Sequence, residues 1–280
     1  MPDTTISKSP NSDCRILVLG AHPDDAEFFA GGLLHEHKRR GSQIRLVSVT
    51  NGQSGHHRDS SDVLVARRRL EASESGRVLG CEYVCWDFPD GSLQPTLQVR
   101  EAIIREIRSF APDLVLTHRP WDYHPDHRAV GQAVQDASYM VMVPKIAPGY
   151  SVPKQEPVVA YMADLFTRPV AFRADFVLDA SEHLAGILKM LACHRSQFYE
   201  WMPWIERIED MPSEPQAWSD WFKRFFLEKT AARGTRFWDP SWGSLPLLVE
   251  AFEVSEYAGK FSAQRQNQLF PACRASIQGS

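Results

Sequence analysis

The fold of this 280-residue chain is decided near its start, by the stretch Arg15-Ile-Leu-Val-Leu-Gly-Ala-His-Pro-Asp-Asp-Ala-Glu-Phe-Phe-Ala-Gly-Gly-Leu-Leu34. Its first six residues, 15–20, are an apolar run that ends in Gly, which is typical of a buried parallel strand. The apolar residues after it are spaced as one face of an amphipathic helix. They are Ala26, Phe29, Ala30, Leu33 and Leu34. A strand that leads directly into a helix predicts a β-α unit.

The same alternation continues to about residue 142. The further predicted strands are 43–49, 83–86 and 114–117, and the further predicted helices are 63–79, 99–110 and 126–142. Alternating strands and helices imply right-handed crossovers and a mostly parallel sheet with helices on both faces. We therefore expect an α/β fold, a Rossmann-like three-layer α/β/α arrangement with an elaborated C-terminal part. In such sheets ligands bind outside the carboxyl ends of the strands.

The second half of the sequence is less regular. After a proline-rich link, 144–157, the predicted strands are 158–162, 176–179 and 245–254, and a predicted helix covers 184–191. One elaborated domain is favoured over two. We expect a disordered N-terminal lead over 1–13, a single domain over 14–262 and a C-terminal tail over 263–280.

The composition is that of an ordinary soluble protein. The net charge of −4 and the mixed charge pattern argue against a nucleic-acid partner. There is neither an apolar run long enough to cross a membrane nor the apolar core of a signal peptide. The five cysteines are odd in number and form no Cys-x-x-Cys pair, so reduced thiols are favoured. We expect a cytoplasmic protein and leave open whether it forms a homo-oligomer.

Two clusters of polar residues carry the chemistry. His22-Pro-Asp-Asp25 follows the first predicted strand, and His124-Pro-Asp-His127 follows the fourth. Loops after these strands can be neighbours in space, and two histidines with a carboxylate and an open position are what a catalytic zinc site needs. Taken singly, such a histidine is usually structural and such an aspartate is usually a helix N-cap. Two such clusters, each at a strand end, favour the metal site over coincidence.

With these motifs the chain resembles the LmbE/PIG-L family of metal-dependent N-deacetylases. Further segments resemble family motifs in the same order. They are Thr50-Asn-Gly52, Arg68-Arg-Leu-Glu-Ala72, Phe88-Pro-Asp-Gly91, Asp179-Ala-Ser181 and Cys193-His-Arg-Ser-Gln197. The resemblance covers roughly residues 14–200, with a weaker echo at Val249-Glu-Ala-Phe252.

The resemblance implies a metal and a general base. The metal ligands it implies are His22, Asp25 and His127, with Zn2+ as the ion and Fe2+ as the alternative. Such a metal lowers the pKa of a water towards ~7 and polarises an acyl carbonyl. Asp24 matches the general base, which takes a proton from that water. The implied substrate is a small N-acylated, N-acetylglucosamine-like sugar, and the products are acetate and a primary amine.

The resemblance also implies residues around the reacting carbonyl. His124 matches a protonated residue that stabilises the oxyanion and assists the leaving amine, with Asp126 as its orienting partner. Arg68 and Asp90 match substrate-binding positions. Some family members have a tyrosine two residues before the first histidine of the second motif. Here that position is Asp122, and a tyrosine follows it at Tyr123.

Several other residues allow two readings. His56 and His57 lie in a polar loop, where a solvated loop is favoured over the mouth of the site. His194, at a helix end, is weighed equally between packing and support of the site. Six of the eight tryptophans fall between 201 and 242, where core or interface is favoured over a sugar platform. The helically spaced aromatic residues there are Trp218, Trp221, Phe222, Phe225 and Phe226.

Two rival functions come from other classes. A metal phosphoesterase would want more carboxylates bridging two metals than this single set offers. A nucleotide-binding module without catalysis is allowed by the fold, but the first strand-helix turn lacks Gly-x-Gly-x-x-Gly. Within the deacetylase reading, the sequence leaves the acylated substrate open between sugars, glycolipids, thiol precursors and antibiotic intermediates. We expect the loops 52–57 and 88–91 to border the metal site.

Overall fold

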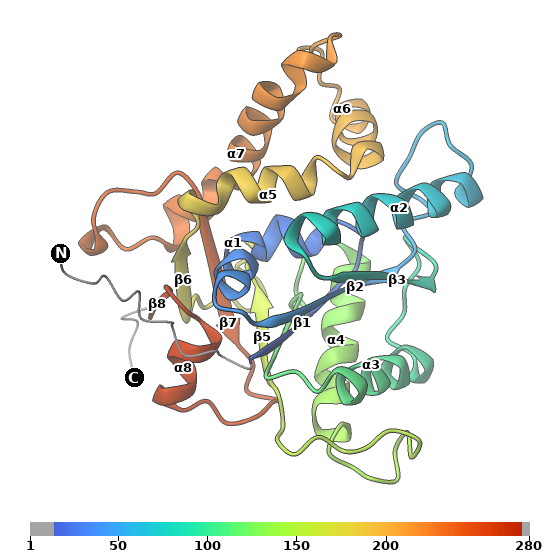
Figure 1. The fold of residues 1–280 in the computed structure, drawn as a ribbon, viewed down its shortest axis with the longest axis vertical. Helices are drawn as coiled ribbons and strands as arrows, with labels where there is room; N and C mark the ends of the chain where they lie inside the picture. Colours follow the sequence, from blue (N-terminus) through green and yellow to red (C-terminus); the bar gives the residue numbers. More distant parts are fainter. Residues whose placement is uncertain (1–13, 276–280) are drawn as a thin grey trace, which may run out of the picture.

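A twisted sheet runs through the middle of the molecule, with helices on both sides (Figure 1). The computed structural model describes residues 14–275, so the expected disordered lead, 1–13, and residues 276–280 of the expected tail lie outside it. Within the described residues the sheet has eight strands in the order β3-β2-β1-β4-β5-β7-β6-β8. The strands are β1 (Arg15–Gly20), β2 (Gln43–Thr50), β3 (Glu82–Phe88), β4 (Leu114–Thr117), β5 (Val158–Met162), β6 (Phe176–Asp179), β7 (Val249–Val254) and β8 (Arg274–Ala275).

The first five strands are parallel, and the last three join the sheet antiparallel. The α-helices are α1 (Asp25–Arg39), α2 (Ser61–Leu79), α3 (Leu97–Phe110), α4 (Pro125–Met140), α5 (Leu184–Leu191), α6 (Met202–Ile205), α7 (Trp218–Phe237) and α8 (Ala263–Leu269). The expected α/β architecture with a mostly parallel sheet is confirmed. No helix in the part of the chain that the structure describes is long and apolar enough to span a membrane.

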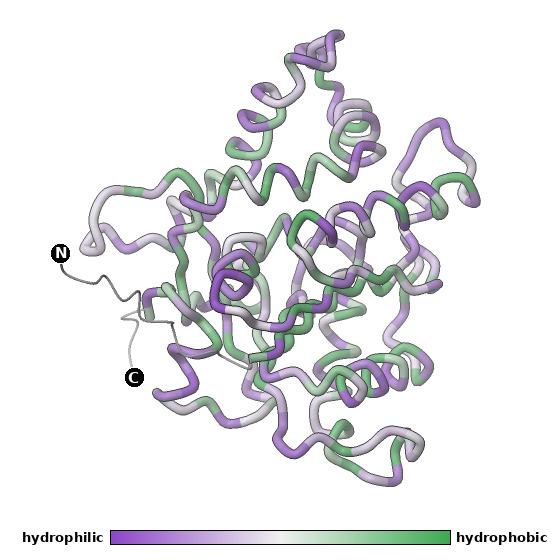
Figure 2. Tube along the Cα trace, in the orientation of Figure 1, coloured by the Kyte–Doolittle hydropathy of each residue, from purple (hydrophilic) through white to green (hydrophobic). Residues whose placement is uncertain are grey.

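Strand β1 shows why the fold has three layers. Its side chains alternate between the two faces of the sheet, as in any strand. Ile16 and Val18 belong to the buried cluster that includes the apolar face of α1, whereas Leu17 and Leu19 belong to the cluster that includes α3 and α4. Both faces of the strand are therefore buried, which explains its uninterrupted apolar run. Figure 2 shows hydrophobic stretches along the central strands and alternating hydropathy along the surrounding helices.

The C-terminal third departs from the expected boundaries in two places. The predicted strand 245–254 begins only at Val249, and Pro246, which has no backbone N–H to donate, lies in the preceding segment. The stretch set apart as a tail from 263 contains, up to residue 275, helix α8 and strand β8, which pairs with β6. The aromatic stripe of α7 is core, as favoured, except for Trp218, which is only partly buried. Its buried members are Trp221, Phe222, Phe225 and Phe226.

Candidate metal site and catalytic residues

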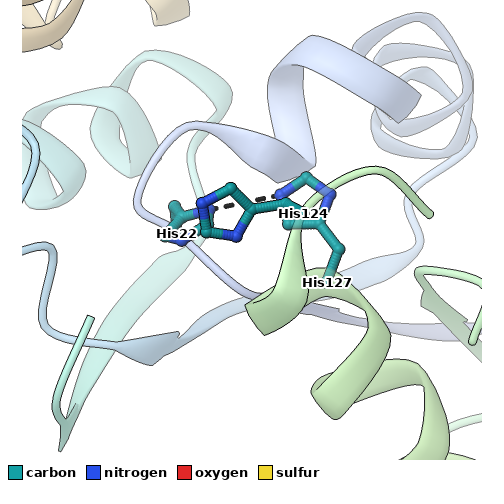
Figure 3. A group of neighbouring side chains, drawn as sticks. All are labelled: His22, His124 and His127. Carbon is teal, nitrogen blue, oxygen red and sulfur yellow. Dashed lines mark hydrogen bonds between the residues drawn. The ribbon is translucent and has the colours of Figure 1, made fainter. Parts of the chain in front are cut away.

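The two His-Pro-Asp clusters meet at the carboxyl ends of β1 and β4, which are hydrogen-bonded neighbours in the sheet. The turn after β1 carries the first cluster, and Pro125 opens α4 with His124 as its N-cap. Gly20 allows the turn to fold back, because a Cβ there would lie 2.9 Å from the Cβ of Asp25. Figure 3 shows the imidazoles of His22, His124 and His127 gathered in one place.

The three residues implied as metal ligands lie close together, with a different oxygen of Asp25 nearest to each histidine. His22 Nδ1 lies 3.2 Å from His127 Nε2. His127 Nε2 lies 3.4 Å from Asp25 Oδ1, and His22 Nδ1 lies 3.6 Å from Asp25 Oδ2. Ligand atoms about 2.0–2.2 Å from a tetrahedral zinc are separated from one another by roughly these distances.

In each ring, one nitrogen faces the proposed metal position (the inner nitrogen) and the other faces a carboxylate (the outer nitrogen). The hydrogen bond of the outer nitrogen sets the tautomer of the neutral ring. His22 Nε2 lies 3.1 Å from Asp90 Oδ1 and 3.3 Å from Asp126 Oδ2, so it donates a proton outwards. His127 Nδ1 lies 3.0 Å from Asp122 Oδ1 and does the same. Each inner nitrogen presents a lone pair when its ring is neutral, and the two inner nitrogens face each other beside a carboxylate. This donor set fits a divalent cation, with carboxylates orienting both histidines as in protein metal sites.

The charges of the site point the same way. Burial would lower the pKa of His22, but hydrogen bonds to Asp126 and Asp90 raise it to about 10. Burial would also lower the pKa of His127, but Asp25 and Asp122 raise it to about 9. Both rings therefore lie where a positive charge is stabilised, which a bound cation would supply.

His118 is a member of this cluster that the sequence analysis did not single out. It follows β4 directly, and its Nε2 lies 3.0 Å from Asp25 Oδ2. Its ring stacks on that of His127 with centroids 3.8 Å apart. The backbone N–H of His22 also donates to Asp25 Oδ2, at 2.7 Å, which leaves Oδ1 to face the metal position. The available signal was the position of His118 at the carboxyl end of a predicted strand.

Asp24 is held in an unusual conformation. Its φ of 144° lies in a region that residues other than glycine rarely adopt, although Asp and Asn tolerate positive φ better than most. Its backbone N–H donates to the hydroxyl of Tyr83 at 2.9 Å. Burial raises the pKa of its carboxyl to about 6 even though Arg68 acts to lower it. The carboxylate lines the pocket beside Asp25.

A buried hydrogen-bond network stabilises this conformation of Asp24. Tyr83 donates to Glu27 Oε2 at 3.2 Å while accepting from Asp24. Ser75 donates to Glu27 Oε1, and His194 Nε2 lies 2.7 Å from the same oxygen. The carboxylate of Glu27 and the ring of His194 are fully buried. His194, for which packing and support were weighed equally, thus supports the residues that hold the turn.

Arg68 links the turn to a distant segment. Its guanidinium donates to the backbone oxygen of Pro23 at 2.6 Å and to Asp24 Oδ2 at 3.3 Å. It also donates to the side-chain oxygen of Gln197, in a π-helical turn that runs from residue 196 to 201. Both terminal nitrogens of Arg68 are therefore engaged within the protein, whereas its buried Nε has no partner among the described residues.

His124 presents a neutral ring to the pocket. Its Nδ1 accepts a hydrogen bond from the backbone N–H of Asp126, so the proton of the neutral ring is on Nε2. Burial, together with nearby His22 and His127, lowers its pKa to about 4. The neutral ring therefore has one N–H to donate, on Nε2, and protonation of His124 during the reaction stays a prediction.

The carboxylates of Asp126 and Asp90 are used differently from what the resemblance implied. The carboxylate of Asp126 contacts His22 rather than His124 and accepts from the backbone N–H groups of Gly91 and Leu93. Asp90, matched to a substrate-binding position, also lies against His22. Both carboxylates are therefore placed to orient His22.

A small polar pocket opens over these groups, with a volume of about 180 Å³. Its lining residues are His22, Asp24, Asp25, Gly55, Arg68, Asp90, Tyr123, His124, Gln197 and Trp201. The two loops expected at this edge, 52–57 and 88–91, contribute Gly55 and Asp90, so that prediction is confirmed.

Tyr123 lies at the mouth of the pocket. Its ring is mostly exposed and lies 5.7 Å from that of His124 and 5.3 Å from that of His127. Asp122, at the position where some family members have a tyrosine, bonds to His127 instead. A tyrosine therefore still lines the pocket, but it is Tyr123, one residue after the position used in those family members.

The loop with His56 and His57 is not the solvated loop that was favoured. The ring of His56 is buried, and its Nε2 lies 3.1 Å from Glu200 Oε2. The ring of His57 stacks on that of Trp204. Both histidines therefore connect this loop to the chain around residue 200.

Comparison with known proteins agrees with the motifs. The sequence model of the PIG-L family, described as GlcNAc-PI de-N-acetylase, matches residues 17–138. A 1D-myo-inositol 2-acetamido-2-deoxy-alpha-D-glucopyranoside deacetylase of Corynebacterium kroppenstedtii is 31% identical in an alignment 144 residues long, which covers 40% of this chain and only 37% of that protein. An uncharacterized deacetylase of Escherichia coli K12, YaiS, is 32% identical in an alignment 158 residues long, which covers 54% of this chain and 80% of that protein.

Solved structures show the same fold. An N,N'-diacetylchitobiose deacetylase from Pyrococcus horikoshii has a TM-score of 0.69 at 22% identity, covering 87% of this chain and 84% of that chain. GalB, a 4-carboxy-2-hydroxymuconate hydratase from Pseudomonas putida KT2440, has a TM-score of 0.64 at 18% identity, covering 89% of this chain and 98% of that chain. At such identities the likeness concerns the fold alone, and the fold serves more than one reaction.

Proposed function

Since this chain belongs to the PIG-L family of deacetylases, we propose that it is a metal-dependent hydrolase that removes the acetyl group from an N-acetylglucosamine-like substrate. The observation that carries the proposal is the proximity of His22, Asp25 and His127, whose nearest nitrogen and oxygen atoms lie 3.2–3.6 Å apart. Zinc is the ion we propose, with Fe(II) as the alternative, because imidazole and carboxylate ligands suit both. When bound, the ion polarises the acyl carbonyl and lowers the pKa of a water.

Asp24 is the general base in this proposal. Its carboxylate lines the pocket, is oriented by Arg68 and is held by a strained turn, so it need not reorganise before taking a proton from the attacking water. Its raised pKa of about 6 suits a group that both accepts and returns a proton near neutral pH.

His124 stabilises the oxygen of the amide as negative charge develops there. Because its Nδ1 is committed to the backbone, Nε2–H is the donor available for the oxyanion. The C–N bond then breaks, and the nitrogen leaves as an amine after taking a proton. Of the groups that line the pocket, we assign this proton transfer to His124 and the protonated Asp24.

Acetate release tests the proposal. The purified protein, loaded with zinc or iron, is given methyl N-acetyl-β-glucosaminide, and free acetate and primary amine are measured. We expect both products in equal amounts, loss of activity with a chelator and recovery on adding the metal back.

Two parallel assays separate the rivals. One offers a phosphodiester such as bis(p-nitrophenyl) phosphate, and the other offers an unsaturated dicarboxylate whose double bond can be hydrated, because GalB shares this fold. Turnover of either without acetate release from any N-acetyl sugar would overturn the proposal.

A further inference from the structure

Three stacked rings begin at the pocket, and two of them, Trp201 and Trp204, lie outside the segment that the family model matches. Trp201 lines the pocket itself. Its ring stacks on that of Trp204, with centroids 5.3 Å apart and planes 26° apart. Trp204 stacks in turn on His57, with centroids 4.6 Å apart and planes 3° apart. We call these three rings the aromatic wall.

The wall is fixed to the protein by charged contacts behind it. Arg67 binds Glu200 through both of its terminal nitrogens, and His56 binds the same carboxylate at 3.1 Å. Arg67 also donates to Asp59 at 3.1 Å. These bonds tie the π-helical turn 196–201 to the loop that carries His57, so the rings are held without a ligand. Short π-helical turns occur frequently at functional sites.

The wall leaves a large apolar surface in solvent. Trp204 is 52% exposed and the neighbouring Ile205 is 51% exposed. The polar pocket beside them has about 180 Å³, below the roughly 300–1,000 Å³ of sites that enclose a whole ligand of drug size. A ligand held by the acyl-binding end therefore extends past the pocket, and the aromatic wall is the surface beside it.

The charges around the pocket favour an uncharged extension. Apart from histidines, the only cationic residue that lines it is Arg68, whose guanidinium is already bonded to Pro23, Asp24 and Gln197. Arg67, behind the wall, is neutralised by Glu200 and Asp59. The guanidinium nitrogens of Arg68 are thus either bonded or, for Nε, buried away from solvent, so an anionic group is poorly matched here. A flat or cyclic neutral group needs no such partner and could stack.

We propose that Trp201, Trp204 and His57 form a stacking subsite for an uncharged ring attached to the N-acylated sugar. The proposal rests on the proposed function for the position of the acyl group. It assigns a preference within that class of substrate: a sugar with a neutral ring attached is favoured over one with a small or an anionic group attached.

The test compares three β-anomers of N-acetylglucosamine that differ only in the group attached at C1. They are the phenyl and methyl N-acetyl-β-glucosaminides and the β-anomer of N-acetylglucosamine 1-phosphate. We expect kcat/KM to be about tenfold higher for the phenyl than for the methyl compound, as a stacking contact of ordinary strength would give, and lowest for the phosphate. Trp204→Ala should abolish the preference for phenyl, and Trp204→Phe should keep most of it.

The matched control is Trp242→Ala. Trp242 also belongs to a pair of contacting rings, with Trp238, but it does not line the pocket. This variant should keep the preference of the parent protein. Equal preferences in the parent protein and Trp204→Ala would overturn the proposal.

A binding measurement keeps the subsite testable if no acetate is released. Phenyl and methyl β-glucosaminide already lack the acetyl group, so calorimetric titration with them reports binding without turnover. Tighter binding of the phenyl compound that is lost in Trp204→Ala supports the wall even where the proposed hydrolysis fails. Equal affinities for the two compounds, or no binding of either, overturn it even where acetate is released.

Discussion

Replacing Asp24 by Asn separates catalysis from stability at a single position. Asn has nearly the same shape, tolerates positive φ about as well and can still accept from Arg68, but it cannot take a proton. The metal-loaded variant should therefore keep its metal and lose 10²–10⁴-fold in turnover, roughly the usual contribution of a general base.

The structure also gives a magnitude for the effect of Asp24→Asn on stability. The substitution should raise the stability of the metal-free protein even though it lowers turnover. Asp24 is only 7% exposed, and burial raises the pKa of its carboxyl from 3.8 to about 6, with the lowering by Arg68 already included. At 1.36 kcal/mol for each unit of pKa, the ionised carboxylate destabilises the metal-free fold on the order of 3 kcal/mol. Because the unfolded carboxyl ionises first, this penalty grows as pH rises from 3.8 to 6 and is complete above it. Metal-free Asp24→Asn should thus be the more stable protein at pH 8.

The assays are turnover, metal content and urea unfolding of the metal-free protein at pH 8. Asp87→Asn is the matched control, because Asp87 is an ion-paired carboxylate whose side chain is 86% exposed. It should change none of the three measurements. Full turnover in metal-loaded Asp24→Asn would refute the general-base role, and a clear loss of stability in the metal-free variant would refute the argument from burial.

Three further predictions concern neighbouring features. His127→Ala should lower metal content and activity together, and elemental analysis showing full occupancy would contradict its role as a ligand. Tyr83→Phe removes the acceptor of the Asp24 N–H, so we expect about 1–3 kcal/mol lower stability and a lower kcat at nearly unchanged KM. An unchanged kcat would show that Tyr83 does not hold the turn in its catalytic conformation. Burial lowers the pKa of His37 from 6.5 to about 4, so the protein should lose about 3 kcal/mol of stability as pH falls through that window, and His37→Gln should lose correspondingly less in urea unfolding at pH 7 and 4.5.

The sequence predicts the sheet well because strand and helix signals are local. The bounds predicted for the strands 15–20, 114–117, 158–162 and 176–179 are those of β1, β4, β5 and β6. The short pairing of β8 with β6 was not predicted, because a two-residue strand has no periodicity of its own.

The site was predictable only where its residues fall in short motifs. His22 and His127 stand in two short motifs at strand ends, and the structure brings them together. The part played by His118 depends on its contact with Asp25, 93 residues away in the chain, and no spacing pattern reports such a contact. The same holds for the bond between His194 and Glu27, which are 167 residues apart. These supporting contacts are properties of the packed structure.

The pairing of β1 with β4 has a consequence for the order of events during synthesis. A chain that has emerged from the ribosome only as far as residue 110 contains His22 and Asp25 but neither β4 nor His127. The proposed ligands come together only when β4 docks beside β1 and α4 begins, since a preformed site rarely exists in an unfolded chain. Metal binding is then a late event, and a bound ion stabilises the pairing of two strands that are separated by about a hundred residues. Loss of the ion would remove that stabilisation from the middle of the sheet.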